Sequence, residues 1–523
     1  MQLPNGQDVS FAYQNRNILN RVSANVGGVI NENIITYEGA FIATLTHNNT
    51  TFVYEYDDRN KVSKVFVKPG ANSVVSETDI PLIDKTTTYS TDGSYNTQLT
   101  YANGYTVKQC YDKYDRLVRI SSVTVTNESP LATFIYADAS VSSNTTEPNY
   151  TATSNSLLRK SIDSCTNIVY NYSYNNDRIC TQVDSSAFTT DFTYDAQGRV
   201  CQKQVDVGAT TVTTVRYFEN DFSSVVSSEA VVIGGQTATT QYTRNSADLP
   251  TEITRTVGEE FEIEQNYTYK PWSETNPQTH VLPLVTNEST QLVLNGVLQE
   301  TQNKDVEYDA NGNIIQYGTT TYEYDSLNRL IRENNQELGK TFLWTYDAGG
   351  NITSRNKYNY TTVATSNLGT YISQDEYRYS ASWKDQLSYF YNEMEGCDCN
   401  SQNGNIRAFK PGLICLCKSF SYDKSGNPTI YRGNALEWNR GRLLTKATLK
   451  DGTVNISYDA QGRRRSKTKG SVYYNYTYEK DKLLQLTTNF GGDPATLTFI
   501  YDSQGVKGFA YNNRIYWRND FVI

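Results

Sequence analysis

A short motif recurs along the chain and limits what the chain can fold into. Its typical form is Tyr-Asp, two variable residues, Gly, then Arg or Asn and usually an aliphatic residue. Self-similarity with a step of about 20 residues indicates a repeat architecture, in which each copy is one supersecondary unit. Six copies carry the Tyr, Asp and Gly positions: Tyr194, Asp195 and Gly198; Tyr308, Asp309 and Gly312; Tyr346, Asp347 and Gly350; Tyr422, Asp423 and Gly426; Tyr458, Asp459 and Gly462; Tyr501, Asp502 and Gly505.

The motif predicts a β-hairpin. The residues before each Tyr-Asp alternate with period two, as in residues 321–324, which is typical of a strand with Tyr on one face. Asp can accept hydrogen bonds from backbone groups ahead of it and so start a turn. Gly then supplies the positive φ that closes a short loop. This role in the turn is enough to explain why the carboxylates recur, so they need not be catalytic.

Exceptions at the Gly position support the hairpin. Asn60, Asp115 and Asn328 stand there, and Asn and Asp best tolerate the left-handed region. A second form, starting at Tyr174, Trp438 and Tyr478, reads as one residue shorter and predicts a tighter turn.

Spacing and composition agree with an all-β fold. Tyr174 to Tyr194 is 20 residues, as is Tyr458 to Tyr478, which is about two strands and two turns. The chain has 42 Tyr against 18 Phe, whereas disordered chains are poor in aromatic residues. Tyr suits a pleated surface on which the ring packs and the hydroxyl stays hydrated.

Several functional classes are excluded. No run of about 18 apolar residues is present, so no membrane-spanning helix is expected, and residues 1–6 do not resemble a signal peptide. A net charge of −9 argues against a nucleic-acid partner. Two histidines, His47 and His280, leave little material for His-based chemistry. Because no nucleophile elbow, zinc-protease motif or P-loop appears, we predict no enzyme and no cofactor.

The repeats resemble the YD repeats of the Rhs family, which bacterial Rhs and wall-associated proteins, Tc-toxin cocoon subunits and teneurins share. The resemblance is strongest from Tyr308 to Trp517, where residues 383–387, 422–433, 436–438 and 509–517 also follow in a family-like order. It implies an all-β fold, in which an antiparallel sheet of about 20-residue hairpins spirals as part of a hollow β-shell. We accordingly divide the chain into a divergent shell segment, 1–300, and a shell core, 301–523, with a Cys-containing insertion at about 393–418.

The same resemblance implies a function. Such shells enclose a C-terminal toxin or act in adhesion, so the expected partners are a toxin or effector, neighbouring shell segments, and glycans. The expected location is secreted or at the bacterial cell surface. The chain lacks the Asp-Pro-x-Gly signature of family members that cleave themselves. We therefore expect a partial shell, whose unpaired strand edges favour self-association.

Eight cysteines leave alternatives open. Cys397, Cys399, Cys415 and Cys417 form two Cys-x-Cys pairs, and residues i and i+2 share a strand face. They are candidates for unlinked thiols, two disulfides or a metal site, although zinc sites normally use Cys-x-x-Cys. The scattered Cys110, Cys165, Cys180 and Cys201 are interpreted as ordinary buried thiols.

Two further features have a structural and a functional interpretation. The basic stretch 463–469 is interpreted as a solvated strand rather than a nucleic-acid patch. The Tyr-rich strands are interpreted mainly as sheet-stabilising, at roughly 0.2–1 kcal/mol per cross-strand pair. The leading hypothesis is thus a non-enzymatic scaffold that encloses or displays an effector. The alternatives are a surface adhesin that binds glycans or proteins, and an enzyme hidden near Cys397.

Overall fold

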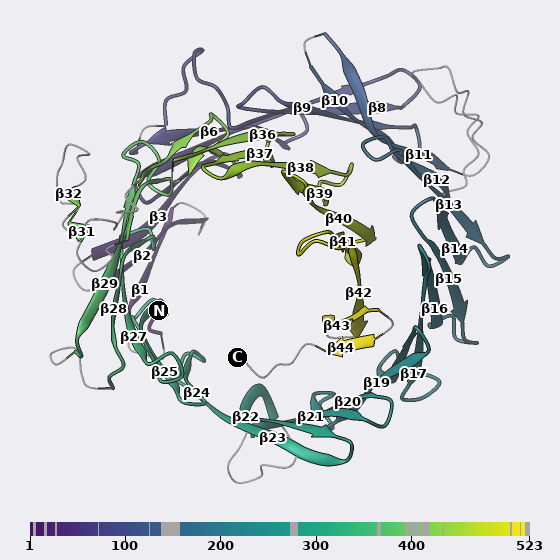
Figure 1. The fold of residues 1–523 in the computed structure, drawn as a ribbon. Coiled ribbons are helices and arrows are strands. Elements are labelled where there is room, and N and C mark those ends of the chain that lie inside the picture. The colour runs from purple at the N-terminus through teal and green to yellow at the C-terminus, as the bar shows by residue number, and fades with distance from the viewer. Residues whose placement is uncertain are drawn as a thin grey trace. The chain divides into compact units, whose positions relative to one another are not determined.

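A computed structural model gives the fold of the chain (Figure 1). It describes residues 1–3, 7–14, 18–26, 29–71, 73–124, 126–136, 157–271, 281–362, 368–392, 397–398, 407–408, 418–431, 433–502, 505–512 and 514–517. These residues form strands β1 to β44 and no helix. The predicted all-β fold of antiparallel hairpins is confirmed.

The largest sheet contains β1 to β30 and β33. Its first strands are β1 (Val9–Gln14), β2 (Ile18–Val26), β3 (Val29–Glu38), β4 (Phe41–His47), β5 (Thr50–Tyr56), β6 (Val62–Pro69), β7 (Ile83–Tyr89), β8 (Tyr95–Tyr101), β9 (Thr106–Tyr111), β10 (Leu117–Val123), β11 (Glu128–Tyr136), β12 (Leu158–Asp163), β13 (Ile168–Tyr174), β14 (Cys180–Ser185) and β15 (Thr189–Tyr194). It continues with β16 (Val200–Val207), β17 (Thr210–Phe218), β18 (Val226–Ile233), β19 (Gln236–Arg244), β20 (Pro250–Val257), β21 (Phe261–Pro271), β22 (Val281–Leu294), β23 (Val297–Tyr308), β24 (Ile314–Tyr317), β25 (Thr320–Tyr324), β26 (Leu330–Asn335), β27 (Lys340–Tyr346), β28 (Ile352–Asn359), β29 (Tyr371–Tyr379), β30 (Leu387–Asn392) and β33 (Lys418–Ser419).

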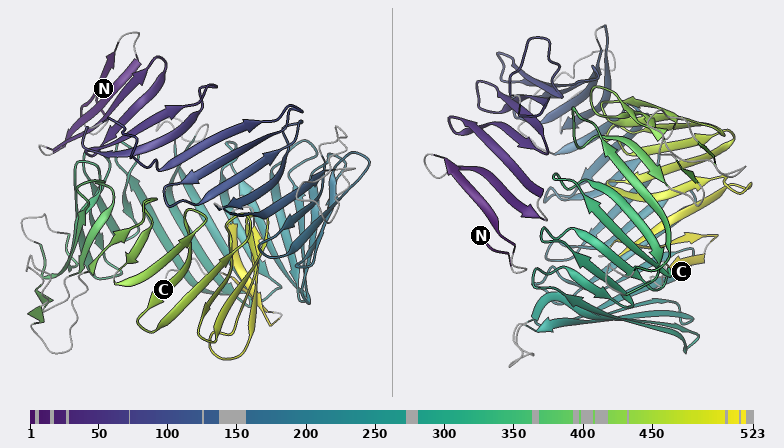
Figure 2. Two further views of the ribbon diagram at one scale, coloured as in Figure 1. Left: turned by 90° about the horizontal axis from the view of Figure 1, so that it is seen from above. Right: turned by 90° about the vertical axis from the view of Figure 1, so that its left-hand side faces the viewer.

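A second sheet contains the later strands. They are β34 (Ser421–Tyr422), β35 (Pro428–Tyr431), β36 (Asn434–Asn439), β37 (Leu443–Leu449), β38 (Gly452–Tyr458), β39 (Arg464–Lys469), β40 (Val472–Glu479), β41 (Lys482–Thr488), β42 (Ala495–Asp502), β43 (Gly505–Tyr511) and β44 (Arg514–Trp517). The short strands β31 (Cys397–Asp398) and β32 (Arg407–Ala408) pair with each other. Strands that follow one another along the chain lie side by side as hairpins in both views of Figure 2.

The strands group into two compact units. One contains Met1–Thr87, Gln98–Thr106 and Asp305–Lys450, and the other contains Thr88–Thr97, Val107–Lys304 and Asp451–Ile523. Each unit therefore combines early and late parts of the chain. The division of the chain into segments 1–300 and 301–523 is based on how closely the repeats follow the motif. It remains a prediction.

A register shift marks each of the six motif hairpins, and it lies just before the Tyr. In the hairpin of β15 and β16, Thr193 pairs with Gln202 but Tyr194 pairs with Val200, so Cys201 is an extra residue. Such a bulge bends the strand and increases its twist. The register shift thus falls at the same place in each of these six hairpins.

The second unit has an apolar core between strands that are distant in sequence. Val212, Val231 and Ile233 pack with Ile500 and Ala510. A neighbouring cluster joins Phe188, Val205 and Val207 to Leu484. In this unit strands β41 to β43 of the second sheet therefore pack on β16 to β18.

The basic stretch 463–469 begins one residue before β39 and continues along that strand, and its side chains are mostly half-buried rather than solvated. Arg464 and Lys467 lie over the rings of Tyr476 and Tyr474, at 6.0 and 5.0 Å. The prediction of a strand is confirmed, but much of its charge lies against aromatic rings of β40.

Candidate functional site: the repeat turns and the contacts of the hairpin tips

The turn between β15 and β16 shows how a repeat closes. The Asp195 amide donates to the Arg199 carbonyl and the Gly198 amide donates to the Asp195 carbonyl, both at 3.0 Å. Asp195 Oδ1 accepts the amides of Gln197 and Arg199, at 3.0 and 2.9 Å. Gly198 has a φ of 78°. The carboxylate therefore satisfies two backbone donors that the turn leaves unpaired.

The same arrangement recurs in most loops of this length, although those that begin at Ser90 and Tyr101 close without such an acceptor. A carboxylate or amide oxygen accepts the amides two and four residues ahead in nine further turns, those of Asp57, Asp112, Asn175, Asn245, Asp309, Asp325, Asp347, Asp423 and Asp459. The residue three positions after it has a positive φ, including the non-Gly residues Asn60 at 61°, Asp115 at 62° and Asn328 at 62°.

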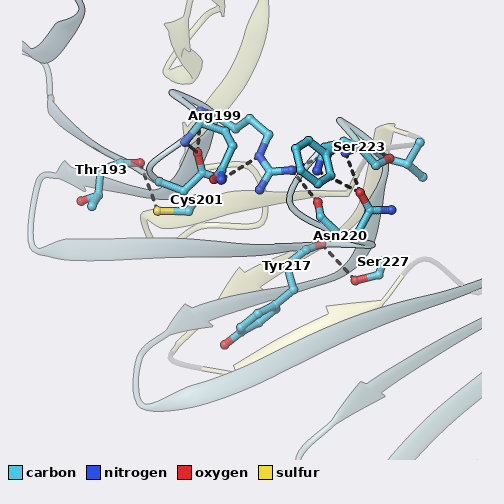
Figure 3. Close-up of polar contacts among 11 residues, drawn as sticks. Thr193, Arg199, Cys201, Tyr217, Asn220, Ser223 and Ser227 are labelled. Carbon is cyan, nitrogen blue, oxygen red and sulfur yellow. Dashed lines mark hydrogen bonds and ion pairs between the residues drawn. The ribbon is translucent and has the colours of Figure 1, made fainter.

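The Arg that follows the Gly position has a role that the sequence analysis missed. Arg199 Nε donates to Asp195 Oδ2 at 2.6 Å, and its guanidinium lies 4.1 Å from the centroid of the Phe218 ring. Arg199 also donates to the carbonyls of Asn220, at 2.8 Å, and Ser223 (Figure 3). One side chain thus joins its own turn to the next loop of the sheet.

Other repeats use Arg or Asn in the same way. Arg116, Arg329 and Arg463 bind the carboxylate four residues earlier and lie 4.6, 4.8 and 5.3 Å from the ring of the next motif Tyr. Where Asn replaces Arg, as at Asn313 and Asn427, the amide still donates to the Asp, at 2.8 Å in both. The recurrence of Arg or Asn four residues after the Asp is the sequence signal of this contact.

The hydroxyl of the motif Tyr also has a fixed partner. Tyr194 donates to the Cys180 carbonyl at 2.7 Å, and Tyr346 donates to the Leu330 carbonyl at 2.6 Å. In both cases the acceptor is the first residue of the strand after the preceding turn. The sequence analysis did not predict this backbone partner for the hydroxyls. The bond explains why the position is Tyr rather than Phe. Equivalent bonds are made by Tyr37, Tyr56, Tyr136, Tyr174, Tyr269, Tyr324, Tyr379, Tyr422 and Tyr501.

The electrostatics match a structural role for these groups. Desolvation raises the pKa of Asp195, but hydrogen bonds from the Arg199 amide and guanidinium outweigh it and hold the pKa below its usual value. Burial raises the pKa of Tyr194. A general acid or base needs a pKa near the working pH, so both shifts move these groups away from that chemistry.

Two of the three turns expected to be shorter are tight. Trp438 and Asn439 pair with Leu444 and Leu443, with positive φ at Arg440 and Gly441. In the copy that starts at Tyr478, the pairing of Glu479 with Lys482 leaves a two-residue loop.

The expectation of a tight turn is wrong for Tyr174, which pairs with Cys180 as Tyr194 pairs with Val200. There Arg178 takes the Gly position with a φ of 65°. The hydrogen bonds of Asn175 hold that turn at the ordinary length, with Asn175 in the place of the motif Asp.

The copy at Tyr501 also departs from the motif. Asp502 pairs with Gly505, whose φ is 124°, so the turn is not closed in the usual way. The Asp502 carboxylate instead accepts from Arg255 Nε and Nη2, both at 3.1 Å, with both side chains almost fully buried. This ion pair joins residues 247 positions apart.

In the first unit, two early hairpin tips contact late repeat turns. We call these the tip contacts. Asn48, between β4 and β5, donates to Asp347 Oδ2 at 3.3 Å and to Asp385 Oδ1 at 3.1 Å. A Cβ on Gly349 would lie 2.3 Å from the Asn48 side chain, so glycine leaves the space that Asn48 fills.

The second tip contact uses Asn103, between β8 and β9. Its Nδ2 donates to Asp423 Oδ2 at 3.3 Å and to the Gly441 carbonyl at 3.2 Å. Its amide donates to Ser425 Oγ at 2.9 Å. A Cβ on Gly441 would lie 2.8 Å from the Tyr101 ring, so this glycine also permits a close approach.

The second unit has equivalent contacts within itself. Asp163, at the tip between β12 and β13, accepts the Ala460 amide at 3.0 Å. Gln236 accepts the Ile515 amide at 2.8 Å. Lys203 and Thr190 bind Glu479. Early tips and strands of this unit therefore bind turns and strands that come more than 270 residues later.

The described residues contain no group of three His, Cys, Asp or Glu side chains placed to hold a metal ion. Cys399, Cys415 and Cys417 lie outside the described residues, and only the backbone of Cys397 is described. Cys110, Cys165, Cys180 and Cys201 are free thiols and half-buried. No helix in the part of the chain that the structure covers is long and apolar enough to cross a membrane.

The fold and the repeated turn define the class of protein: a YD-repeat shell protein built from antiparallel hairpins. A family model described as the teneurin YD-shell matches residues 1–365, which is more than half of the chain. The chain belongs to this family. The suspected relationship to the Rhs and YD-repeat proteins is therefore confirmed.

One solved structure shows the same fold. The chain is similar to a chain of the crystal structure of TcdB2-TccC3-Cdc42, with a TM-score of 0.56, 14% identity, and coverage of 100% of this chain and 29% of that chain. For TcdB2-TccC3 without its hypervariable C-terminal region, the TM-score is 0.28, the identity 14%, and the coverage 96% of this chain and 31% of that chain. The chain thus spans less than a third of both matched chains. A comparison with curated proteins found no match.

Proposed function

We propose that the chain is a non-enzymatic section of a YD-repeat shell that encloses or displays a C-terminal effector outside the cell. The observation that carries the proposal is that the polar groups of the motif form hydrogen bonds within the sheet. The motif Asp, Arg and Tyr bind backbone and side chains of their own and neighbouring repeats, as at Asp195, Arg199 and Tyr194. Membership of the teneurin YD-shell family supports the same function.

The proposed mechanism is containment. Within each unit, the tip contacts and the buried Arg255–Asp502 pair hold early strands to late ones. A cargo enclosed by these strands is released when the contacts break. The expected partners are therefore the effector and adjoining shell segments.

Protease protection tests containment. An unstructured reporter peptide is fused to the C-terminus of the chain, and in a control protein the same peptide is fused to the N-terminus. We expect cleavage at the C-terminus to be slower than at the N-terminus, and to accelerate in an Asn48→Asp variant. Equal cleavage of the two fusions would count against containment.

A second candidate function is adhesion, and one cavity favours it. The first unit has a cavity of about 350 Å³ in which Trp383 and Tyr422 lie with Gln386 and Lys424. Aromatic faces beside polar groups suit an amphipathic ligand such as a sugar ring. A glycan array with the wild type and a Trp383→Ala variant tests this function. Binding that the variant loses supports adhesion, whereas an array without binding argues against it.

A further inference from the structure

The tip contact of Asn103 has a chemical feature that the contact of Asn48 lacks. Asn103 is followed by Gly104, whereas Asn48 is followed by Asn49. Glycine has no Cβ to hinder its amide nitrogen, so an Asn-Gly pair in a flexible segment readily lets that nitrogen reach the Asn side-chain carbonyl carbon. The turn that docks on the late repeats therefore carries a reactive dipeptide.

We propose that Asn103-Gly104 is a spontaneous deamidation site that is blocked while the tip is docked, and that reacts once the tip leaves. The Gly104 nitrogen bonds to Asn103 Cγ, the Cγ–Nδ2 bond breaks, and ammonia leaves with the proton from Gly104. Water then opens the cyclic imide to aspartate or isoaspartate. The net reaction converts amide and water into carboxylate and ammonium, without oxidation or reduction.

Docking blocks the first step by fixing the geometry. Nδ2 is committed to Asp423 and the Gly441 carbonyl, and the Asn103 amide is held by Ser425, whose side chain is 1% exposed. The Gly104 amide donates to the Tyr101 carbonyl at 2.8 Å, so the attacking nitrogen is engaged as well. Asn103 itself is solvent-exposed. Protection therefore comes from the locked conformation and not from exclusion of water.

The product cannot dock as the amide does. An Asp at position 103 replaces the Nδ2 donor with a second acceptor, which faces the Asp423 carboxylate and the Gly441 carbonyl. Asp423 Oδ2 already accepts from Asn427 at 2.8 Å. Like charges at this distance repel, and isoaspartate also lengthens the turn backbone by one atom. Deamidation thus makes an opened contact permanent, whether or not the shell holds a cargo.

The chain offers an internal control. Asn295-Gly296 forms the exposed turn between β22 and β23, with φ values of 51° and 73°. The full chain is incubated at mildly alkaline pH, and both sites are followed by peptide mapping with mass spectrometry. We expect Asn103 to deamidate roughly tenfold more slowly than Asn295, which corresponds to about 1.4 kcal/mol of protection. In urea the two rates should converge, and Ser425→Ala should accelerate Asn103 alone.

Equal rates at the two sites in the native chain would overturn the proposal, as would a rate at Asn103 that urea does not change. A second measurement tests the product directly. Hydrogen exchange at residues 423–427 should increase in an Asn103→Asp variant but stay unchanged in an Asn295→Asp variant. Unchanged exchange in Asn103→Asp would show that the carboxylate docks as well as the amide, and the proposal would be rejected.

Discussion

The hydrogen bond of the motif Tyr hydroxyl leads to a testable prediction: losing this hydroxyl should reduce stability, whereas losing the hydroxyl of an exposed Tyr should not. Tyr194→Phe keeps the ring but removes the hydroxyl that donates to the Cys180 carbonyl at 2.7 Å. Tyr217 lies close by on β17, where its side chain is 57% exposed (Figure 3). Tyr217→Phe is therefore a matched control with the same loss of one oxygen atom.

The expected cost follows from the hydrogen bond alone. A neutral hydrogen bond within a protein contributes about 0.5–1.5 kcal/mol net, so Tyr194→Phe should lower the free energy of unfolding by about 1 kcal/mol. Tyr269, on β21 of the same unit, donates to a different acceptor, the Pro250 carbonyl, at 2.8 Å. The two losses should then add, so that the Tyr194→Phe/Tyr269→Phe double variant loses about 2 kcal/mol.

Urea titration followed by circular dichroism measures these losses as shifts of the unfolding midpoint at constant slope. Tyr217→Phe should keep the wild-type midpoint. The reasoning is refuted if Tyr194→Phe also keeps it, or if the control loses as much stability as Tyr194→Phe does.

Three further predictions concern the turns, the buried ion pair and the tyrosines. Gly198→Val should cost at least about 1–2 kcal/mol, because φ is 78° while no atom lies within 4 Å of the added Cβ, whereas Gly198→Asn should cost much less; thermal unfolding of both variants checks the order. Asp502→Ala should cost about 3–5 kcal/mol because it strands the buried Arg255, and Arg255→Met/Asp502→Leu should recover much of that loss; equal losses in the single and double variants would contradict the assignment. Burial, and then the charge of Asp347, raises the pKa of Tyr379 from 10.0 to about 12. Its contribution to stability should be complete below pH 10 and lost as the pH rises towards 12, so a urea midpoint that stays flat over this interval in the wild type would disprove it.

The hairpins could be predicted from sequence because their causes are local. A carboxylate, a residue that tolerates positive φ and a strand with period two all lie within a few positions of one another, as in the turn of Asp195 and Gly198. Asn60, Asp115 and Asn328 fit the same rule, since all three have φ values near 60°. Arg178 shows its limit, because the surrounding hydrogen bonds impose positive φ on a residue that does not favour it.

The contacts between distant parts of each unit could not be predicted. Asn48 and Asn103 are ordinary turn residues in sequence, and their partners come about 300 residues later in the chain. No local pattern indicates which Asn at a hairpin tip meets a carboxylate. The family model matches residues 1–365, which includes the part where the motif letters are most variable. In this part the turns of Asp57 and Asp112 keep the usual hydrogen bonds and the positive φ although the Gly of the motif is replaced.

The central claim is that the hydrogen bonds of the motif Asp hold the turn of each repeat, and hydrogen exchange measured by mass spectrometry tests it most directly. The amides of the residues two and four positions after the motif Asp, such as Gln197 and Arg199, donate to that carboxylate. We expect these amides to exchange slowly in every ordinary turn, and Asp195→Ala to release them in its own turn alone. Rapid exchange of these amides in the wild type, at the rate of open loops, would contradict the account.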